Sequence, residues 1–467
     1  MSSNSSSKNS HAWLNAGAIE TALGRESAPE TSVIRDILDK SLAMEPLGLD
    51  EIVALMRVKK PEDWVLIMGT ADLLKQKAYG DRIVLTAPLH IANDCASECL
   101  YCSAHKSNDT VKRKRLSPYD VKEAGTKLMR QGHKRIVVSA GQEETFDAEY
   151  YAEIIEALHH IFDGIGEIRQ VNTNLGALDG ADYEVLKNLD TGTVNIFQET
   201  YHESCYRRAH PKGPKSDFFK RLEAPDVALK AGMKDVGLGL ALGLGPWEYD
   251  LLALSLHASH LTQEYGAGNK NVNLHRIRLA PGCNFEVPHP LNNRDFIHCV
   301  ALVRLAIPYS GIVLSTREPE GLWREGCNAG CSQILTGSLA NPYESWINAP
   351  GEKIPFPLGE DCHLDEVVRF LLEEAKNLPS FCSACPRLGR SGSEFRQLVC
   401  NGGIKDQCGP NSMASFMEFL LNYATPYTRK LGEKLISEKL EKLDEHERRA
   451  SEKLLQKVRS GRMDEFI

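Results

Sequence analysis

Residues Cys95-Ala-Ser-Glu-Cys99-Leu-Tyr-Cys102 contain three cysteines separated by three and then two residues. They follow the apolar run 82–92, which predicts a strand. Thiolates are the usual ligands of iron–sulfur clusters, and four of them saturate a [4Fe–4S] cube. With only three, one iron keeps an open position for an external ligand. The alternatives are a zinc site or buried free thiols, but zinc loops usually need a second cysteine pair nearby.

The composition fits a large protein that uses its thiols for metals. The chain has 467 residues, 42% hydrophobic and 25% charged, which is enough for a large core. Its net charge of −8 and the lack of a long basic block argue against nucleic acid as the main partner. The 13 cysteines and the absence of a secretory signal indicate a reducing compartment. No apolar run approaches the roughly 20 residues of a membrane helix, so we expect a cytoplasmic protein without a membrane partner.

The hydrophobic pattern predicts an α/β fold with a parallel (β/α)8 TIM barrel. Residues 1–10 have a disordered composition, and helical periodicity covers 12–79. Strand-like runs then alternate with amphipathic segments, which is typical of barrels. The strands are expected at 82–92, 135–140, 167–175, 193–199, 235–244, 272–280, 312–316 and 333–337. The helices are expected at 118–131, 148–165, 181–189, 218–231, 248–264, 294–306 and 322–328.

We expect four regions along the chain. They are an N-terminal helical extension (1–79), the barrel (80–340), a C-terminal cluster-binding domain (341–426) and a charged C-terminal helix (427–467). Residues 427–460 are dense in Lys and Glu at mixed spacing, which predicts a solvated surface helix.

Polar residues gather where the predicted strands end. Barrel enzymes work at the C-terminal ends of their strands, so these residues are expected to share one mouth. For any single residue, the general polarity of barrel ends is an equally good explanation. The polar runs are 139–143, 172–174, 198–202, 275–278, 315–318 and 336–338.

A second group of cysteines follows the barrel. Cys382 and Cys385 are separated by two residues, and Cys408 follows after 22 more. Three thiolates again suffice for a cube with one open iron. Cys400 offers a fourth thiol, so a structural zinc on all four cysteines is an equal alternative on spacing alone.

The two groups together resemble the radical SAM superfamily and, within it, the HydG-type FeFe-hydrogenase maturases. The likeness runs from about residue 80 to 425. It also includes the runs Ala-Pro-Leu at 87–89, Gln-Glu-Thr-Tyr-His at 198–202, Gly-Pro-Lys-Ser-Asp at 213–217 and Leu-Ser-Thr-Arg-Glu at 314–318. Several of these occur in the thiamine-pathway tyrosine lyase ThiH, which lacks the C-terminal cysteines.

This resemblance implies a radical SAM carbon–carbon lyase with S-adenosylmethionine and two [4Fe–4S] clusters. A 5′-deoxyadenosyl radical would take hydrogen from L-tyrosine, and cleavage of the Cα–Cβ bond would give p-cresol and dehydroglycine. In HydG-type enzymes dehydroglycine becomes the carbon monoxide and cyanide of the hydrogenase H-cluster. The implied partners are a reducing protein such as flavodoxin or ferredoxin, and hydrogenase maturation scaffold proteins. The implied cluster ligands are Cys95, Cys99 and Cys102 for the first and Cys382, Cys385 and Cys408 for the second.

The family's motifs also imply roles for other residues. Tyr101 would pack against adenine, and Glu199 and Arg221 would hold the charged ends of the cofactor. Arg317 or Arg324 would hold the substrate carboxylate, because a guanidinium binds two oxygens at once. A surface ion pair explains Arg324 equally well. The other implied residues are Gly141, Gln142, Glu143 and Asn174 for the cofactor, and Ser315 and Ser338 for the substrate.

One residue departs from the family's pattern. HydG-type proteins have a His in a Gly-x-Gly-Pro-His run that binds an extra iron, whereas residues 266–270 read Gly-Ala-Gly-Asn-Lys. His275 is five residues further on, so a strand places it about 16 Å away on the opposite face. The extra iron is therefore not expected in its usual form. Lys270 favours an alternative, a paralogue that acts on another amino acid without the carbon monoxide and cyanide chemistry. A non-catalytic iron–sulfur or zinc scaffold is a third interpretation.

Overall fold

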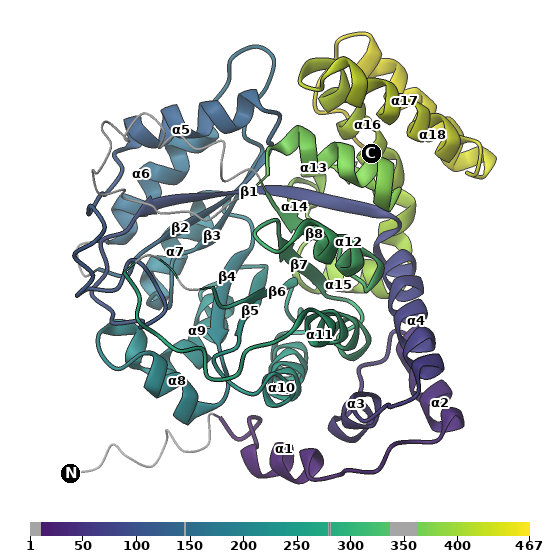
Figure 1. Ribbon diagram of the computed structural model, residues 1–467. Coiled ribbons are helices and arrows are strands. Elements are labelled where there is room, and N and C mark those ends of the chain that lie inside the picture. Colours follow the sequence, from purple (N-terminus) through teal and green to yellow (C-terminus); the bar gives the residue numbers. More distant parts are fainter. Residues whose placement is uncertain (1–10, 144–145, 279, 281, 337–361) are drawn as a thin grey trace.

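The computed structural model describes residues 11–143, 146–278, 280, 282–336 and 362–467 (Figure 1). Its centre is a parallel sheet in the order β2-β3-β4-β5-β6-β7-β8-β1, which closes because β1 also pairs with β2. The expected eight-stranded barrel is confirmed. Its strands are β1 (Arg82–Ala92), β2 (Arg135–Ala140), β3 (Gln170–Asn174), β4 (Val194–Glu199), β5 (Val236–Leu242), β6 (Asn271–Arg276), β7 (Gly311–Ser315) and β8 (Gln333–Leu335).

The barrel interior combines apolar packing with a ladder of amides. Asn273 donates from Nδ2 to Asn195 Oδ1 and to Asn271 Oδ1, both at 3.1 Å. All three side chains are buried, and buried amides are tolerated because they satisfy one another. The sequence pattern did not predict this polar interior.

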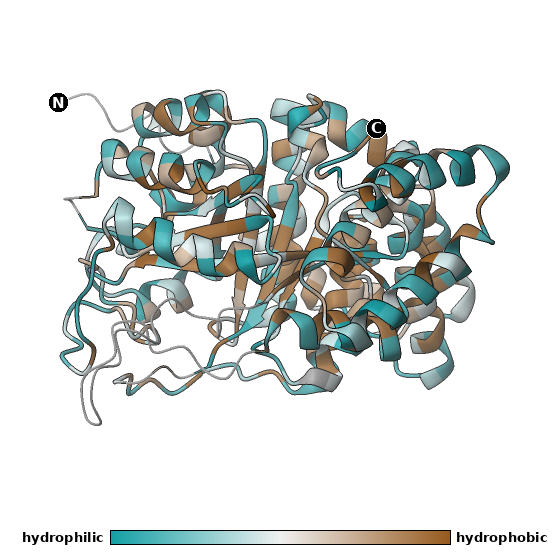
Figure 2. Cartoon of the chain, turned by 90° about the horizontal axis from the view of Figure 1, so that it is seen from above, coloured by the Kyte–Doolittle hydropathy of each residue, from teal (hydrophilic) through white to brown (hydrophobic). Residues whose placement is uncertain are grey.

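The helices that follow the strands cover the outside of the barrel, and hydrophobic residues concentrate on the strands between them (Figures 1 and 2). Ser117 begins the first of these helices with a capping box to Asp120, and Pro118 occupies the first turn. The outer helices are α5 (Pro118–Arg130), α6 (Ala148–His159), α7 (Gly180–Asn188), α8 (Glu203–Ala209), α9 (Phe218–Lys230), α10 (Trp247–Tyr265), α11 (Asn293–Ala306) and α12 (Glu320–Asn328). The short helices α8 and η1 (Pro214–Ser216) were not predicted, and α6 ends six residues before its predicted end.

Four helices precede the barrel, as the periodicity predicted. They are α1 (Ala16–Leu23), α2 (Thr31–Leu42), α3 (Leu49–Met56) and α4 (Pro61–Tyr79). The last of them packs against α11, and its buried face includes Ile67, Ala71 and Leu74. These helices therefore share the hydrophobic core of the barrel. Within the described part of the chain, no helix is long and apolar enough to cross a membrane.

The C-terminal region adds a strand and a helical cluster. It contains α13 (Leu364–Phe370), the π-turn η3 (Leu371–Ala375), β9 (Leu378–Ser380), α14 (Ala384–Arg387), α15 (Gly392–Cys400), α16 (Gly403–Asn422), α17 (Pro426–Leu440) and α18 (Glu445–Arg459). Strand β9 was not predicted; it pairs in parallel with the start of β1.

The expectation of a single solvated helix over 427–460 was wrong. The stretch forms two helices, because Asp444 caps the N-terminus of α18 by accepting from the Glu447 amide. Helix α18 packs against α16 and buries Leu454, Leu455 and Val458.

Candidate active site

The three-cysteine loop after β1 is held by backbone hydrogen bonds to two other loops. The Ala96 amide donates to Gln142 O at 2.7 Å, in the loop after β2. On the other side, the Glu98 amide donates to Lys212 O at 2.9 Å and the Leu100 amide to Ala209 O at 3.0 Å. The cysteine loop is therefore fixed between the loop after β2 and the C-terminal end of α8 with the segment that follows it.

Two glycines permit this close packing. A Cβ on Gly141 would lie 2.0 Å from Asp94 O, and one on Gly213 would lie 2.3 Å from Ala96 O. Gly213 also has a φ of +87°, which residues with a side chain rarely adopt. Beside Gly141, the Gln142 amide donates to Cys95 Sγ at 3.4 Å, so a backbone N–H is directed at the first thiol.

The pKa values of two thiols in this loop are raised. Burial raises the pKa of Cys99 to about 12, although the Lys215 charge opposes this. Burial also raises the pKa of Cys102. Such thiols do not ionise alone in neutral water, but bound iron replaces the proton and supplies the missing positive charge.

Glu199 lies at the end of β4 in a cationic pocket beside the cysteine loop. It is buried, has a φ of +71° and follows an irregularity in the pairing of β4 with β5. Lys215 Nζ forms an ion pair with Glu199 Oε1, and Arg221 Nη2 lies 3.9 Å from the same oxygen. Burial alone would raise the pKa of Glu199, but Lys215, Arg221 and His275 outweigh it and lower the pKa to about 2. The carboxylate is therefore ionised at any physiological pH.

Tyr101 joins this pocket to an apolar wall. Its hydroxyl lies 2.9 Å from His210 Nε2 and accepts from Lys215 Nζ at 3.3 Å. Its ring packs against a small hydrophobic cluster formed by Ala209, Ala241, Leu244, Phe285 and Ile277. Sequence reasoning did not single out Lys215 or His210, although Lys215 stands within the conspicuous run at 213–217.

Asp250 supports the chain immediately after Glu199. It is fully buried and accepts from Thr200 Oγ1 at 2.8 Å and from the Tyr201 amide at 2.7 Å. Burial raises the pKa of Asp250 to about 7, although these hydrogen bonds oppose the rise.

Other predicted residues also reach this mouth. Asn174 ends β3 and is half-buried, as are Gln142 and Glu143 in the loop after β2. Ser315 ends β7, and its Oγ accepts from the Arg317 amide at 3.2 Å. Arg317 lies close enough to His90 for its charge to assist burial in lowering the pKa of that imidazole to about 3.

Of the two alternatives for Arg324, the structure supports the surface ion pair. Its side chain lies on α12, is 44% exposed and forms an ion pair with Glu374 at 3.1 Å. It is therefore directed away from the barrel mouth and toward η3. Helix spacing alone could not distinguish the outer face of α12 from the inner one. Ser338 lies outside the described residues.

The second group of cysteines lies at the opposite end of the barrel. Cys382, Cys385 and Cys408 line a cavity of about 60 Å³. The rest of the lining comes mainly from the N-terminal ends of the barrel strands, including Arg82, Arg135, Gln170, Asn271 and Gln333. The first three cysteines follow the C-terminal end of β1, so the barrel separates the two groups.

Among the three cysteines, Cys385 alone has a lowered pKa, because burial raises the pKa of Cys382 and the hydrogen bond with Cys385 raises that of Cys408. A hydrogen bond from the Cys408 thiol lowers the pKa of Cys385, and the cations Lys270, Arg82 and Arg135 lower it further. Arg135 Nε also donates to Cys382 O at 2.9 Å. Nearby cations and N–H groups suit the negative charge of a thiolate-bound cluster.

Cys400 does not complete a four-cysteine site. It ends α15 and does not line the cavity. Burial raises the pKa of the Cys400 thiol, although the nearby Arg396 charge opposes this. The zinc alternative that required Cys400 is therefore not supported by the fold. Among the described residues, no three His, Cys, Asp or Glu side chains converge on a single metal ion.

Lys270 lines the cavity with its side chain held in place. Its Nζ lies 3.0 Å from Asp235 Oδ2 and 3.4 Å from the centre of the Phe395 ring. Asp235 also accepts from the Gly392 amide at 2.9 Å. His275 is at the other end of β6, where its charge acts on Glu199, so it does not replace the missing His.

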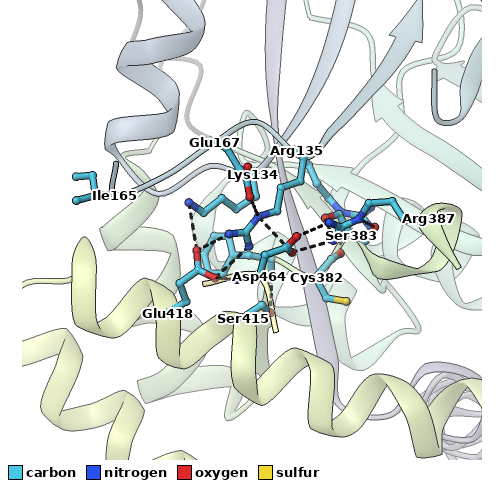
Figure 3. A network of polar contacts seen from close by, with 12 residues as sticks. Lys134, Arg135, Ile165, Glu167, Cys382, Ser383, Arg387, Ser415, Glu418 and Asp464 are labelled. Carbon is cyan, nitrogen blue, oxygen red and sulfur yellow. Dashed lines mark hydrogen bonds and ion pairs between the residues drawn. The ribbon is translucent and has the colours of Figure 1, made fainter. Parts of the chain in front are cut away.

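A buried ionic network supports the second cysteine loop (Figure 3). Glu418 on α16 accepts from Arg169 Nη2 at 2.8 Å and lies 3.4 Å from Lys134 Nζ. Asp464 lies 3.3 Å from Arg169 Nε and forms two hydrogen bonds with Arg387. The network thus joins the barrel, α16 and the cysteine loop.

With this geometry in place, comparison with known proteins identifies the family. The chain is 33% identical to a crystal structure described as HydG, a maturase of the [FeFe]-hydrogenase, with 97% of this chain and 100% of that chain covered and a TM-score of 0.91. The chain belongs to the radical SAM superfamily. The HydG structure from Carboxydothermus hydrogenoformans is 32% identical, with 90% and 93% of the chains covered and a TM-score of 0.76.

Matches to protein-family profiles agree with this assignment to the radical SAM superfamily. The radical SAM superfamily profile matches residues 89–250, and that of the biotin and thiamin synthesis associated domain matches residues 273–389. The 2-iminoacetate synthase of Escherichia coli is 29% identical over 283 residues, which cover 60% of this chain and 73% of that protein. The chain is therefore a radical SAM enzyme of the tyrosine lyase type, the group of HydG and ThiH. Membership implies a [4Fe–4S] cluster, S-adenosylmethionine and an amino acid substrate.

Proposed function

We propose that this radical SAM enzyme is a HydG-type lyase that cleaves the Cα–Cβ bond of L-tyrosine to p-cresol and dehydroglycine. We further propose that dehydroglycine becomes the carbon monoxide and cyanide of the hydrogenase H-cluster. One observation carries this proposal: two groups of three cysteines lie at opposite ends of one barrel. Two solved structures named HydG, which are 32–33% identical to this chain over most of its length, support the proposal.

In this proposal, Cys95, Cys99 and Cys102 hold the first [4Fe–4S] cluster. When bound, that cluster supplies the electron that cleaves S-adenosylmethionine to methionine and the 5′-deoxyadenosyl radical. The chain's contribution is to position the reactants and to exclude water. The apolar wall around Tyr101 suits an adenine ring.

Charged residues at the same mouth orient the reactants. Glu199 is ionised and fixed by Lys215, so it can accept hydrogen bonds from the cofactor's hydroxyl or ammonium groups. Arg221 is fixed through a 2.6 Å hydrogen bond from Nε to Phe197 O, which leaves its Nη atoms for a carboxylate. The loop 141–143 and Asn174 line the cofactor's side of the mouth. Arg317, with Ser315, takes the tyrosine carboxylate.

At the other end, Cys382, Cys385 and Cys408 hold a second [4Fe–4S] cluster. The cations Arg82, Arg135 and Lys270 around the cavity support this assignment.

Lys270 favours a second candidate function. Its ammonium group is held beside Cys385 by Asp235 and Phe395, and an ammonium group cannot bind a metal as imidazole does. This candidate is a paralogue that performs the same radical cleavage on another amino acid without making carbon monoxide and cyanide.

One anaerobic experiment separates these functions. The reconstituted protein is incubated with tyrosine, S-adenosylmethionine and dithionite, and p-cresol, cyanide and carbon monoxide are measured. All three products support the first proposal. Cleavage of S-adenosylmethionine without p-cresol contradicts tyrosine as substrate and supports the second candidate. No cleavage at all contradicts both. As controls, Cys99→Ala is expected to abolish every product, whereas Cys408→Ala is expected to retain p-cresol.

A further inference from the structure

Residues 464–467 lie across the second cysteine loop. Asp464 forms two hydrogen bonds with Arg387, one of them 2.8 Å long, and the Phe466 ring lies 4.6 Å from the same guanidinium. The Ile467 amide donates to Asn411 Oδ1 at 2.9 Å, and Ile467 O accepts from Asn411 Nδ2 at 3.2 Å. These residues, which we call the strap, therefore cross from α16 to the loop.

Arg387 transmits this contact to the cysteines. Its Nε donates to Ser383 O at 3.2 Å and its Nη2 donates to Ser383 Oγ at 3.1 Å. Ser383 stands between Cys382 and Cys385, so Arg387 fixes the backbone that carries both thiols. The guanidinium bonds to the Asp464 carboxylate and to Ser383 at once, which restricts its orientation.

Asp464 also contacts the barrel below the cavity. Its carboxylate lies 3.3 Å from Arg169 Nε, and its amide donates to Glu418 Oε2 at 3.0 Å. Arg169 directly precedes Gln170, which lines the cavity. Successive side chains of an extended chain point to opposite sides. Arg169 therefore takes part in the ionic network, and Gln170 lines the cavity.

The same alternation occurs at the start of β2. Lys134 lies 3.4 Å from Glu418 in the network, and the next residue, Arg135, lines the cavity and donates to Cys382 O. The side chains of Lys134, Arg169 and Glu418 are only 2–3% exposed. A buried charge network is stable only when every member is paired, so losing one partner is costly.

The backbone of Asp464 is built for this position. Its φ is +58°, in the left-handed region that Asp and Asn tolerate better than most residues. In this conformation the amide reaches Glu418 and the carboxylate reaches Arg387.

We propose that Asp464 is a positioning residue for the second cysteine site, acting through Arg387 and Ser383 to fix the loop 382–385 against the barrel. The effect on bound iron rests on the proposal that these cysteines hold a cluster. Mutating a residue that orients metal ligands without binding the metal itself typically changes metal affinity or activity by roughly 10–100-fold.

The neighbouring residue offers a matched control. Glu465 forms ion pairs with Lys457 at 2.5 Å and Arg462 at 3.5 Å. Neither partner contacts the cysteine loop. Asp464→Asn and Glu465→Gln each remove one charge from adjacent positions, and Asn keeps the tolerance of positive φ. A difference between the two variants therefore reports the contacts of the Asp464 carboxylate with Arg387 and Arg169.

The test uses two measurements on the full-length chain. In the apoprotein, hydrogen–deuterium exchange of amides 382–391 is expected to be about tenfold faster in Asp464→Asn and unchanged in Glu465→Gln. Phe466→Ala is expected to have a smaller effect in the same direction. Equal exchange in Asp464→Asn and Glu465→Gln would overturn the proposal.

The second measurement uses a background in which Cys95, Cys99 and Cys102 are replaced by Ala, so that only the second site can hold a cluster. Release of iron to a ferrous chelator is expected to be at least ~10-fold faster after Asp464→Asn than after Glu465→Gln. If the background binds no iron and sulfide, the proposed second cluster is contradicted, and with it the expected effect of Asp464 on iron release. Exchange of amides 382–391 then still decides whether Asp464 positions the loop.

Discussion

Replacing Gly213 with Ala is expected to displace the first cysteine loop. A Cβ at this position would lie 2.3 Å from Ala96 O and 2.5 Å from Ser97 Cα, whereas ordinary contact begins at 3.4 Å. Both atoms belong to backbone, so the loop must move by about 1 Å to accommodate the methyl group. A displacement of this size in an active site can cost about 100-fold in rate. We therefore expect formation of 5′-deoxyadenosine to fall about 100-fold.

Gly164→Ala is the control for this prediction. Gly164 has a φ of +85°, almost the same as the +87° of Gly213, but nothing lies within 4 Å of its Cβ position. Both substitutions place an alanine at a positive φ, but only Gly213→Ala also drives a Cβ into the backbone of the cysteine loop. The assay is anaerobic 5′-deoxyadenosine formation with dithionite, normalised to bound iron. Equal rates in the two variants would refute the idea that contact between 213 and 96–97 positions the loop.

Three further predictions concern the other sites. Cys408→Ala is expected to lower iron from about eight to about four per chain, whereas Cys400→Ala keeps about eight by iron analysis, because only Cys408 lines the cavity. Arg317→Ala is expected to lower p-cresol formation at least ~10-fold, whereas Arg324→Ala leaves it unchanged and costs at most about 1 kcal/mol, since its ion pair is exposed. Asp250 has a pKa raised to about 7, so the folded state keeps a proton that the unfolded state loses above about pH 4, and stability falls as the pH rises through this window. Asp250→Asn is expected to flatten that loss, as measured by guanidinium unfolding midpoints at pH 5 and pH 8.

The regular part of the fold was predictable because it depends on local patterns. Strand β5, with all seven residues buried, is the continuous apolar run expected of a buried parallel strand, although β3 and β6 contain several polar residues. Strand β9 could not be found, since it has three residues, includes Pro379 and gains its partner only through tertiary contact with β1.

The candidate sites were predictable to different degrees. The cysteine spacing carries local information, so the two groups were visible in the sequence. The roles of Lys215 and Asp464 depend on residues brought together by the fold, and neither has a spacing that reveals its partner. The two alternatives for Arg324 could not be separated for a related reason. Helix α12 presents residues on all sides, and only the packed structure shows which side faces solvent.

Strand β1 has a consequence for how the two ends of the enzyme communicate. It is 11 residues long, its first residues pair with β9 just before Cys382, and two residues separate its last residue, Ala92, from Cys95. At about 3.3 Å per residue, this strand sets a distance of roughly 30 Å between the two groups of cysteines. The two groups of cysteines therefore lie at opposite ends of the barrel, at a separation that this strand sets. A single-residue deletion in β1 would shift both groups at once, so the two ends cannot vary independently.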